Sequence, residues 1–461
     1  MSSLTPTLYL PIEEVNREFD SKLLIALELL GDGITVIIGR NPLLVANFAF
    51  MPPGAILFKG MNTVPALVMK SAVANGHVAL TTDEEALGIA EIHEMVRNMD
   101  PSTASSCQIF FAQGRRHAEA MALRIPEAAD RIQVVGNARL DLLREPFRSA
   151  YLEEAREHER IHGDYVMINT NFGAINSQWG DADAFKKVLE RIGWLDSSKA
   201  SDREYYECRL RTEKANITLI RGVLERLAAR FPDTTFIIRP HPAERDVPWR
   251  QAYGDRANVH VTAEGNHISW LLGSKLLLHT GCTTGLEAEV LGVPCLTLLP
   301  PDHGSLSSAD LLSNQANERA VGVDQAVAVS AHILNGRVVR DPTEREARLL
   351  ALRDHLEALN GRFAYQRIAN EIRTLLIPAL ENHPTFDWLP TDREAFVKTR
   401  EHSERRLGKT SRSGYLWNKA EIDRTVLSRR IESLSQAIGS TLDPIVSEVA
   451  DGVFRLEVPP G

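Results

Sequence analysis

The chain has 461 residues, of which 44% are hydrophobic and 25% are charged, as is typical of a folded globular protein. This length suffices for two or three domains of ordinary size. The net charge of −9 argues against nucleic acid as the main partner, because a nucleic-acid-binding surface is rich in Lys and Arg.

The sequence contains no apolar run of the roughly 20 residues that a membrane span needs, and its first residues do not resemble a secretory signal. Its four cysteines lack the spacing of a zinc site. We therefore expect a reduced, cytoplasmic protein, and we expect neither a cofactor nor a bound metal. A position at the inner face of the inner membrane is compatible with this expectation.

Short apolar runs alternate with helical patterns from the N-terminus onward. Residues 8–10 and 34–38 are typical of strands, and the segment between them places its apolar residues on one helix face. Further strands of this first set are expected at residues 55–58, 78–80, 108–111 and 132–135. Such alternation predicts βαβ units and a mostly parallel sheet.

A second alternating set follows a charged helical segment at residues 147–160. Its strands are expected at residues 165–168, 235–238, 259–261, 276–278 and 295–298. We therefore predict an α/β fold with two Rossmann-like domains that face a central cleft, followed by a helical extension. The predicted boundaries are 1–150 for the N-terminal domain, 151–378 for the second domain with its closing helices, and 379–461 for the extension.

Two motifs in the second half come directly after predicted strands. They are Arg239-Pro240-His241-Pro242 and, about forty residues later, Thr280-Gly281-Cys282-Thr283-Thr284-Gly285. Ligands of open α/β sheets bind beyond the carboxyl ends of the strands, and a helix that starts there favours phosphate. The residues assigned to a nucleotide-sugar site are Arg239, Pro242, Glu244, Gly281, Thr283, Thr284, Gly285 and Glu287, with Asn169 and Asn171 from the end of the strand at 165–168.

The prolines on both sides of His241 stiffen its segment and present the imidazole. His241 is expected to act in acid catalysis or in phosphate binding. Arg239 would pair with a negatively charged group of the ligand, or brace the loop by pairing with Glu244. Glu287 would accept from ribose hydroxyls or complement the helix dipole. Cys282 is interpreted as a small residue in a tight loop.

Two carboxylates near the N-terminus, Glu18 and Asp20, are candidates for catalysis because they follow the first predicted strand. Sugar transfer needs a carboxylate, either as the base for the acceptor hydroxyl or as the nucleophile. The alternative is structural, with Asp20 capping the helix that begins there. Near the other end, the basic tract at 395–420 would form a solvated face, or else contact an anionic membrane or a charged glycan.

The two motifs, together with Glu287-Ala288-Glu289-Val290-Leu291-Gly292-Val293-Pro294, resemble GT-B glycosyltransferases that build bacterial surface polysaccharide. The chain resembles most the surface carbohydrate biosynthesis proteins, whose N-terminal signature is similar to residues 11–24 and 36–40. Relatives of this group include sialyltransferases and Kdo transferases, which use CMP-activated acidic sugars. The resemblance implies that His241-Pro242 and Thr283-Thr284 hold the donor phosphate, and that Glu18 or Asp20 supplies the catalytic carboxylate.

The resemblance implies a metal-independent GT-B glycosyltransferase of capsule or lipopolysaccharide biosynthesis. Its donor would be a CMP-activated acidic sugar such as Kdo or a nonulosonate, and its acceptor a glycan or a lipid-linked glycan. Three alternatives are a CDP-glycerol glycerophosphotransferase, a UDP-sugar 2-epimerase and a non-catalytic assembly factor.

Overall fold

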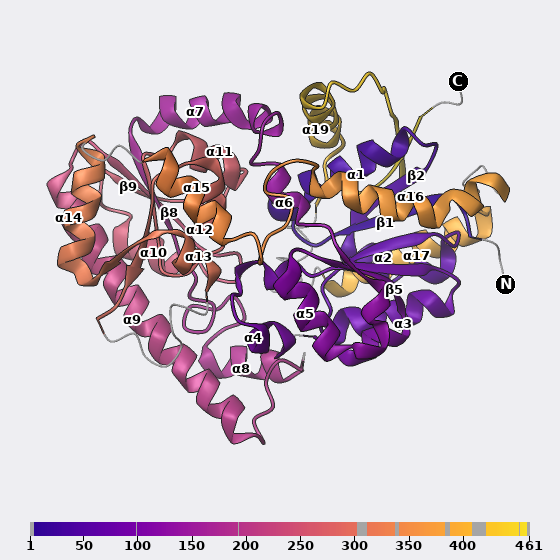
Figure 1. Cartoon of the computed structure of the whole chain (residues 1–461), viewed down its shortest axis with the longest axis horizontal. Coiled ribbons are helices and arrows are strands. Elements are labelled where there is room, and N and C mark those ends of the chain that lie inside the picture. Colours follow the sequence, from indigo (N-terminus) through magenta and orange to yellow (C-terminus); the bar gives the residue numbers. More distant parts are fainter. Residues whose placement is uncertain are drawn as a thin grey trace. The chain divides into compact units, whose positions relative to one another are not determined.

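The computed structural model describes residues 4–97, 99–191, 193–301, 311–336, 341–382, 388–407, 421–450 and 452–458. They form two compact units, shown in Figure 1. Unit 1 consists of Met1–Glu84, Asn98–Ala150 and Asp354–Gly461, and unit 2 consists of Glu85–Arg97 and Tyr151–Arg353. Each unit is built on its own mostly parallel sheet with helices, so the prediction of two Rossmann-like α/β domains is confirmed.

The sheet of unit 1 has the strand order β13-β14-β2-β1-β3-β4-β5-β6. Strands β1 to β6 are parallel, and β14 pairs antiparallel with β2. Strand β2 lies on one side of β1, and β3 to β6 follow on the other side. The position between β1 and β3 is therefore the topological switch point of the sheet. The strands are β1 (Thr7–Ile12), β2 (Thr35–Arg40), β3 (Ala55–Lys59), β4 (Val78–Thr82), β5 (Cys107–Ala112), β6 (Ile132–Val134), β13 (Ile445–Ala450) and β14 (Val453–Glu457).

The central strands of unit 1 form its core. Every residue of β1 and β2 is buried, as expected for parallel strands that are covered on both faces. The helices that accompany this sheet are α1 (Asp20–Leu30), α2 (Asn41–Val45), α3 (Thr63–Ala74), α5 (Arg115–Arg124), α6 (Ala138–Asp141), α16 (Ala364–Asn382), α17 (Pro390–Leu407) and α19 (Arg424–Ala437).

The sheet of unit 2 is parallel throughout, in the order β12-β11-β10-β7-β8-β9. This order corresponds to the doubly wound arrangement of dinucleotide-binding folds, and its switch point lies between β7 and β10. The strands are β7 (Tyr165–Asn169), β8 (Thr235–Arg239), β9 (Val259–Val261), β10 (Leu276–His279), β11 (Cys295–Leu299) and β12 (Glu318–Val321).

The helices of unit 2 are α4 (Ile92–Arg97), α7 (Leu152–His162), α8 (Ala182–Arg191), α9 (Ala200–Arg230), α10 (Val247–Tyr253), α11 (His267–Gly273), α12 (Thr284–Leu291), α13 (Leu312–Ala316), α14 (Gly322–Leu334) and α15 (Pro342–Ala351). The second half of α9 packs on the sheet through Leu219, Ile220, Val223, Leu224 and Leu227. Its first half runs past the sheet toward α8, as Figure 1 shows.

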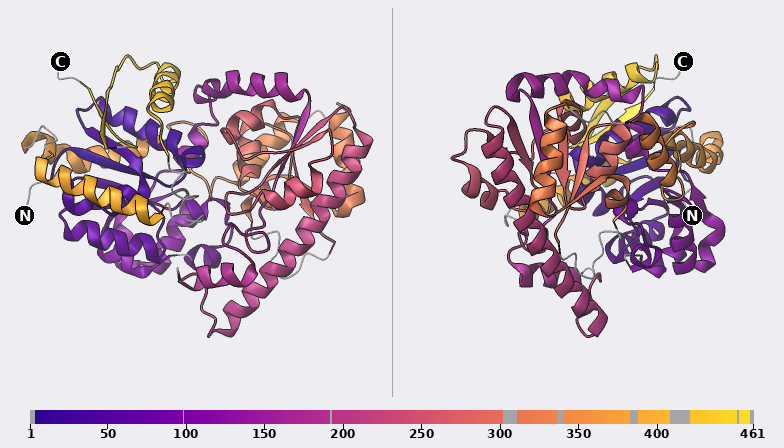
Figure 2. Two further views of the ribbon diagram at one scale, coloured as in Figure 1. Left: turned by 180° about the vertical axis from the view of Figure 1, so that it is seen from behind. Right: turned by 60° about the vertical axis from the view of Figure 1, so that its left-hand side comes forward.

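The C-terminal segment differs from the predicted helical extension. Residues 379–461 include α17 and α19, but they end in the hairpin β13-β14, which extends the first sheet at the β2 edge (Figure 2). Val453, Phe454 and Leu456 of β14 are buried there. The segment therefore belongs to unit 1, because it completes that sheet and contributes to its core.

The predicted basic tract at 395–420 is described only in part. Residues 395–407 lie in α17, where Phe396 is buried and contacts Trp388 edge to face, and residues 408–420 lie outside the described residues. Among the helices that the structure describes, none has the length and apolar content to cross a membrane.

Truncating the chain after Gly439 is expected to destabilise unit 1. The truncation removes β14, exposes the hydrogen-bonding edge of β2 and removes three buried apolar side chains, each of which contributes about 1.5–3 kcal/mol. We expect the free energy of unfolding of unit 1, measured by urea titration, to fall by several kcal/mol. Removal of residues 459–461 alone should leave this free energy unchanged. Equal urea midpoints for the full-length chain and the chain that ends at Gly439 would contradict this role of the hairpin.

Candidate functional site

The switch point of unit 2 brings together two of the predicted binding segments. β7 ends at Asn169, β10 ends at His279, and α12 begins at Thr284. The Nδ2 of Asn169 donates a hydrogen bond of 2.9 Å to Thr284 Oγ1. Asn169 is 94% buried, and its Oδ1 has no hydrogen-bond partner among the described residues. A buried acceptor of this kind is costly unless a ligand or water satisfies it.

His279 fixes the shape of the loop between β10 and α12. Its Nδ1 accepts hydrogen bonds from the backbone N–H groups of Gly281 (3.0 Å) and Cys282 (3.2 Å). Burial lowers the pKa of His279 to about 3, so its ring is neutral and keeps this acceptor at physiological pH. Gly281 has φ +132°, a conformation that an L side chain rarely adopts. The loop geometry thus depends on one histidine and one glycine.

At the start of α12, two backbone N–H groups make no hydrogen bond to the described residues. The N–H of Gly285 donates to the carbonyl of Cys282 (3.0 Å), whereas those of Thr283 and Thr284 have no partner in the part of the chain that the structure describes. A Cβ on Gly285 would lie 2.5 Å from His279 Nε2, so this glycine lets the helix approach the histidine. The remaining donors, with the helix dipole, form an arrangement suited to a phosphate.

His241 follows β8 and is half-buried. Its Nδ1 accepts a hydrogen bond of 3.1 Å from the backbone N–H of Ala243. A ring that accepts at Nδ1 is neutral and carries its proton on Nε2. In this state Nε2–H can donate a hydrogen bond to an anionic oxygen. The predicted role of His241 in phosphate binding or in acid catalysis stays a prediction.

Glu244 connects the loop after β7 with the loop after β8. Its Oε1 accepts from Thr170 Oγ1 (2.7 Å), from the N–H of Phe172 (2.9 Å) and from the N–H of His241 (3.2 Å). Burial outweighs these hydrogen bonds and raises the pKa of the carboxyl above its ordinary value. The carboxylate of Glu244 thus holds the two loops together, and its predicted contact with the ligand stays a prediction.

Arg239 also serves the scaffold. Its guanidinium donates to the carbonyls of Glu264 (2.7 Å) and Gly265 (3.1 Å) and lies over the ring of Trp270, 5.2 Å from the centroid. Burial lowers its pKa to about 10, so it remains charged at neutral pH. The predicted loop bracing is present, but through carbonyls 264 and 265 and not through Glu244. These contacts use one N–H of each terminal nitrogen of the guanidinium.

Glu287 has a partner that the sequence analysis missed. His267 Nε2 lies 2.9 Å from Glu287 Oε2, and the glutamate is almost fully buried in the first turn of α12. His267 opens α11, so the pair joins two helices of unit 2. The other predicted residues at this edge, Asn171 and Pro242, are half-buried in the two loops. Their predicted contacts with a ligand stay predictions.

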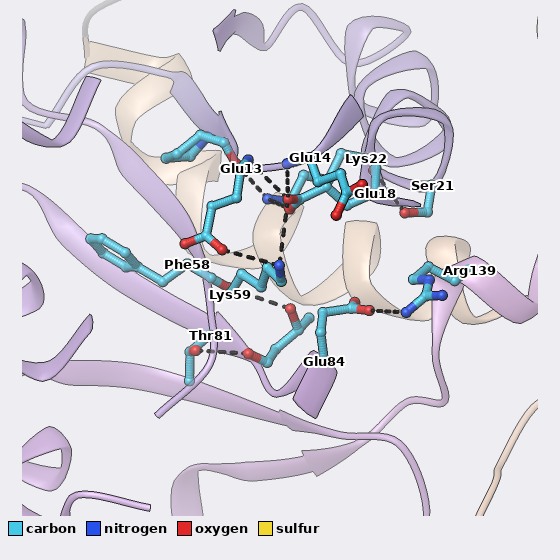
Figure 3. Close-up of polar contacts among 12 residues, drawn as sticks. Glu13, Glu14, Glu18, Ser21, Lys22, Phe58, Lys59, Thr81, Glu84 and Arg139 are labelled. Carbon is cyan, nitrogen blue, oxygen red and sulfur yellow. Dashed lines mark hydrogen bonds and ion pairs between the residues drawn. The ribbon is translucent and has the colours of Figure 1, made fainter. Parts of the chain in front are cut away.

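Glu18 in unit 1 is held as a carboxylate in a network of ion pairs, which Figure 3 shows. Its Oε1 accepts from the N–H groups of Glu13 and Glu14 (both 2.9 Å), and its Oε2 lies 2.6 Å from Lys22 Nζ. Burial alone would raise its pKa, but the charges of Lys22 and Lys59 and these hydrogen bonds lower it to about 2. A group with so low a pKa is a poor base.

Asp20, the other predicted catalytic carboxylate, is also occupied. Arg430 of α19 forms two hydrogen bonds with it, Nε to Oδ1 at 3.0 Å and Nη2 to Oδ2 at 2.5 Å. This bidentate pair attaches α19 to the start of α1. Glu18 is thus held by ion pairs beside β1 and β3, and Asp20 is bound to the C-terminal segment. Their predicted catalytic roles stay predictions that these contacts do not favour.

Unit 1 also contains a small pocket at the carboxyl ends of β3, β4 and β5, next to Lys22 of the Glu18 network. Part of its lining is apolar, from Ile25, Leu57, Phe111 and Ile368. Its polar lining residues are Ser21, Lys22, Thr82, Asp83, Glu84, Gln113 and Asn137. Behind them, His117 Nε2 lies 3.6 Å from Asp83 Oδ2, and Arg139 Nη1 lies 3.3 Å from Glu84 Oε2. The sequence contained a signal for this pocket, since Asp83 and Glu84 come two threonines after the predicted strand at 78–80 and directly after the observed strand β4.

Among the described residues, no group of three or more His, Cys, Asp or Glu side chains has an arrangement that could hold a metal ion. The four cysteines, including Cys282 in the β10-α12 loop, are buried and form no disulfide.

No protein-family model matches the chain, and no curated protein sequence matches it. Similar solved structures include a UDP-GlcNAc 2-epimerase from Neisseria meningitidis bound to UDP-GlcNAc, at 15% identity and a TM-score of 0.46, covering 81% of this chain and 100% of the epimerase. The wall teichoic acid polymerase TagF matches at 12% identity and a TM-score of 0.47, covering 82% and 91%. The epimerase from Methanocaldococcus jannaschii, in complex with UDP-GlcNAc and UDP, matches at 13% and 0.45, covering 80% and 99%.

At this level of similarity the solved structures do not identify a family.

Replacing Glu18 by Gln is expected to remove a stabilisation that depends on pH. The folded-state pKa of about 2 lies below the unfolded value of about 4.3, so the carboxylate stabilises unit 1 above pH 5 and loses this effect as the pH falls toward 2. The difference amounts to about 3 kcal/mol at pH 7. Urea unfolding of wild type and Glu18→Gln should show this difference in free energy of unfolding at pH 7, and the difference should be smaller at pH 3. A gap independent of pH would refute the assigned ion pairs.

Proposed function

We propose that the chain is a glycosyltransferase of the GT-B type, which binds a nucleotide-activated sugar in unit 2 and transfers the sugar to a glycan or lipid-linked acceptor. The observation that carries the proposal is the Asn169–Thr284 hydrogen bond at the switch point of unit 2. This hydrogen bond joins the first strand of the sheet to the start of α12. The amides there and the buried Oδ1 of Asn169 are groups that a polar ligand would satisfy.

The donor diphosphate or monophosphate would be bound by three groups from two loops. The N–H groups of Thr283 and Thr284 would donate to one phosphate oxygen, and His241 Nε2–H would donate to another. Because His241 donates without giving up its proton, it would stabilise the charge that develops on the leaving phosphate. Glu244 would support this arrangement by accepting from the His241 N–H.

The nucleoside would lie beside the first turn of α12. There Glu287, paired with His267 at 2.9 Å, offers a carboxylate that could accept from ribose hydroxyls. For the donor we propose a CMP-activated acidic sugar, following the resemblance of His241-Pro242 and Thr283-Thr284 to the CMP-phosphate-binding pairs of Kdo and sialic acid transferases. The contacts of Arg239 indicate that the acidic group of such a sugar would be recognised by other residues.

The proposal predicts that CMP stabilises the folded chain and that the stabilisation requires His241 and Asn169. A ligand at one hundred times its dissociation constant adds about 2.7 kcal/mol, which is visible as a melting shift. The measurement is a thermal-shift panel with CMP, CDP, UMP, UDP, GDP and ADP on wild type, His241→Ala and Asn169→Ala. His332→Ala, which removes an exposed histidine of α14 in the same unit, is the matched control and should respond like wild type.

Each outcome of the panel selects a function. A CMP shift that is lost in His241→Ala and Asn169→Ala supports transfer from a CMP-sugar. A preference for CDP favours a CDP-glycerol glycerophosphotransferase, and a preference for UDP favours a UDP-sugar enzyme, including a 2-epimerase. A wild-type chain that responds to none of the six nucleotides contradicts donor binding and favours the assembly factor.

A further inference from the structure

One face of the long helix α9 meets the loop that follows β7 in unit 2. Tyr205, Arg209 and Glu213 recur at a spacing of one helical turn, so they lie on the same face of α9. Oε2 of Glu213 accepts hydrogen bonds from the backbone N–H groups of Ala174 (2.8 Å) and Ile175 (3.1 Å). These bonds fix this face of the helix against the β7 loop.

The guanidinium of Arg209 is paired along one edge. Its Nε donates a hydrogen bond of 3.0 Å to Glu213 Oε1, and its terminal nitrogens donate to no other group among the described residues. Burial would lower the pKa of Arg209, but the charge of Glu213 and the neighbouring Tyr205 raise it above its ordinary value, so the group is a cation. The side chain is 26% exposed. Nη1 and Nη2 can therefore donate to an anion.

A second arginine lies over the ring of Tyr205. The guanidinium carbon of Arg97, at the end of α4, is 4.3 Å from the centre of that ring. Its Nη1 is 3.6 Å from Asp202 Oδ1 and its Nε is 3.8 Å from Glu94 Oε2, and both distances exceed that of a hydrogen bond. Nη1 is buried and has no hydrogen-bond partner among the described residues. A buried donor of this kind is costly unless a ligand or water satisfies it.

The carboxylates beside the two arginines have partners of their own. Oδ2 of Asp202 accepts from the N–H of Asp196 at 2.9 Å, and Oε1 of Glu94 lies 3.5 Å from His93 Nε2. Together with Glu213, these carboxylates offset the positive charge of the arginines. An anion would therefore be bound through directed hydrogen bonds, without an excess of positive charge. This arrangement suits a singly charged, planar carboxylate, whereas a doubly charged phosphate favours a cluster of cations or backbone amides.

Arg209 lies next to the loop that carries His241. A Cβ built on Gly173, in the loop after β7, would lie 3.6 Å from the Cβ of Ala243 and 3.9 Å from Nη2 of Arg209. Gly173 is thus adjacent both to the segment that follows His241 and to the guanidinium. The free edge of Arg209 is therefore a near neighbour of the imidazole that we propose as a ligand of the donor phosphate.

The segment that ends at Arg97 approaches the proposed phosphate site from another direction in the sequence. Residues 85–97 belong to unit 2. A Cβ built on Gly88 would lie 2.7 Å from Cγ2 of Thr283, so the absence of a side chain at residue 88 lets this segment pack against the loop before α12. Arg97 and Arg209 are thus each connected to one of the two loops that carry the proposed phosphate ligands.

We propose that Arg97, Tyr205 and Arg209 form an anion subsite in unit 2 that binds a carboxylate of the nucleotide-linked sugar. The inference rests on the proposed function, in which His241 and Thr283 bind the donor phosphate. Nη1–H and Nη2–H of Arg209 would donate to the two carboxylate oxygens, in the bidentate geometry that a guanidinium favours. Arg97 Nη1–H and the Tyr205 hydroxyl would donate to the remaining lone pairs.

Calorimetric titration of the full-length chain tests the subsite. The ligands are CMP, CDP and CMP-sialic acid, with UDP-glucose and UDP-glucuronate as a pair that differs by one carboxylate. The variants are Arg209→Gln, Arg97→Gln and Tyr205→Phe. Arg209→Lys keeps a cation beside Glu213 and replaces Arg209→Gln if the latter does not fold. Arg211→Gln, an exposed arginine on the same helix, is the matched control.

We expect wild type and Arg211→Gln to bind CMP-sialic acid more tightly than CMP. The ratio of the two dissociation constants should fall about tenfold to a hundredfold in Arg209→Gln. The fall should be smaller in Arg209→Lys, which loses the bidentate geometry, and in Arg97→Gln and Tyr205→Phe, which each lose one set of donors. Because CMP is the reference in each variant, a general weakening of the donor site leaves the ratio unchanged.

The outcomes separate the subsite from the proposed function. CMP binding without a preference for CMP-sialic acid, or with a preference that survives in the Arg209 variants, overturns the subsite and leaves the proposed donor site standing. Binding of none of the five ligands contradicts the proposed function and the subsite together. An Arg209-dependent preference for UDP-glucuronate over UDP-glucose, without CMP binding, supports the subsite and contradicts the CMP donor. An Arg209-dependent preference for CDP over CMP, without a preference for either carboxylate, assigns the cluster to a phosphate and overturns the proposal.

Discussion

The hydrogen bond from Asn169 Nδ2 to Thr284 Oγ1 is the interaction on which the candidate donor site depends. It connects the first strand of unit 2 with the helix that follows the fourth strand, across the switch point of the sheet. On one side, Glu244 ties the β7 loop to His241. On the other side of the switch point, His279 fixes the backbone conformation of the loop before α12. Loss of any of these contacts would move the amides and the imidazole apart.

The two sheets use their switch points in opposite ways. In unit 1 the space between β1 and β3 contains Glu18, Lys22 and Lys59, whose charges satisfy one another at 2.6 and 3.7 Å. In unit 2 the corresponding position contains Asn169, whose buried Oδ1 has no partner among the described residues. The switch point of unit 1 is filled by ion pairs, whereas that of unit 2 has a polar atom without a hydrogen-bond partner among the described residues. This contrast is the reason for proposing nucleotide recognition in unit 2 and not at the switch point of unit 1.

Local patterns predicted much of this arrangement and contacts distant in sequence decided the rest. Alternating apolar runs predicted two parallel sheets, and strand ends predicted Asn169, His241 and Thr284 at one edge. The same rule applied to Asp83 would have found the unit 1 pocket. By contrast, the pairing of Asp20 with Arg430 spans 410 residues, so no local pattern shows that this carboxylate is occupied. The hairpin on β2 was missed for the same reason.

Hydrogen exchange with and without CMP tests the central claim most directly, because it locates bound nucleotide on the chain without requiring turnover. The account predicts that CMP slows exchange in peptides that cover residues 169–173, 241–245 and 281–288, which carry the amides and the loop contacts of the unit 2 switch point. Peptides over the closed switch point of unit 1, residues 13–22, should exchange as in the free protein. Protection at residues 13–22, with unchanged exchange at the three unit 2 segments, would contradict the account.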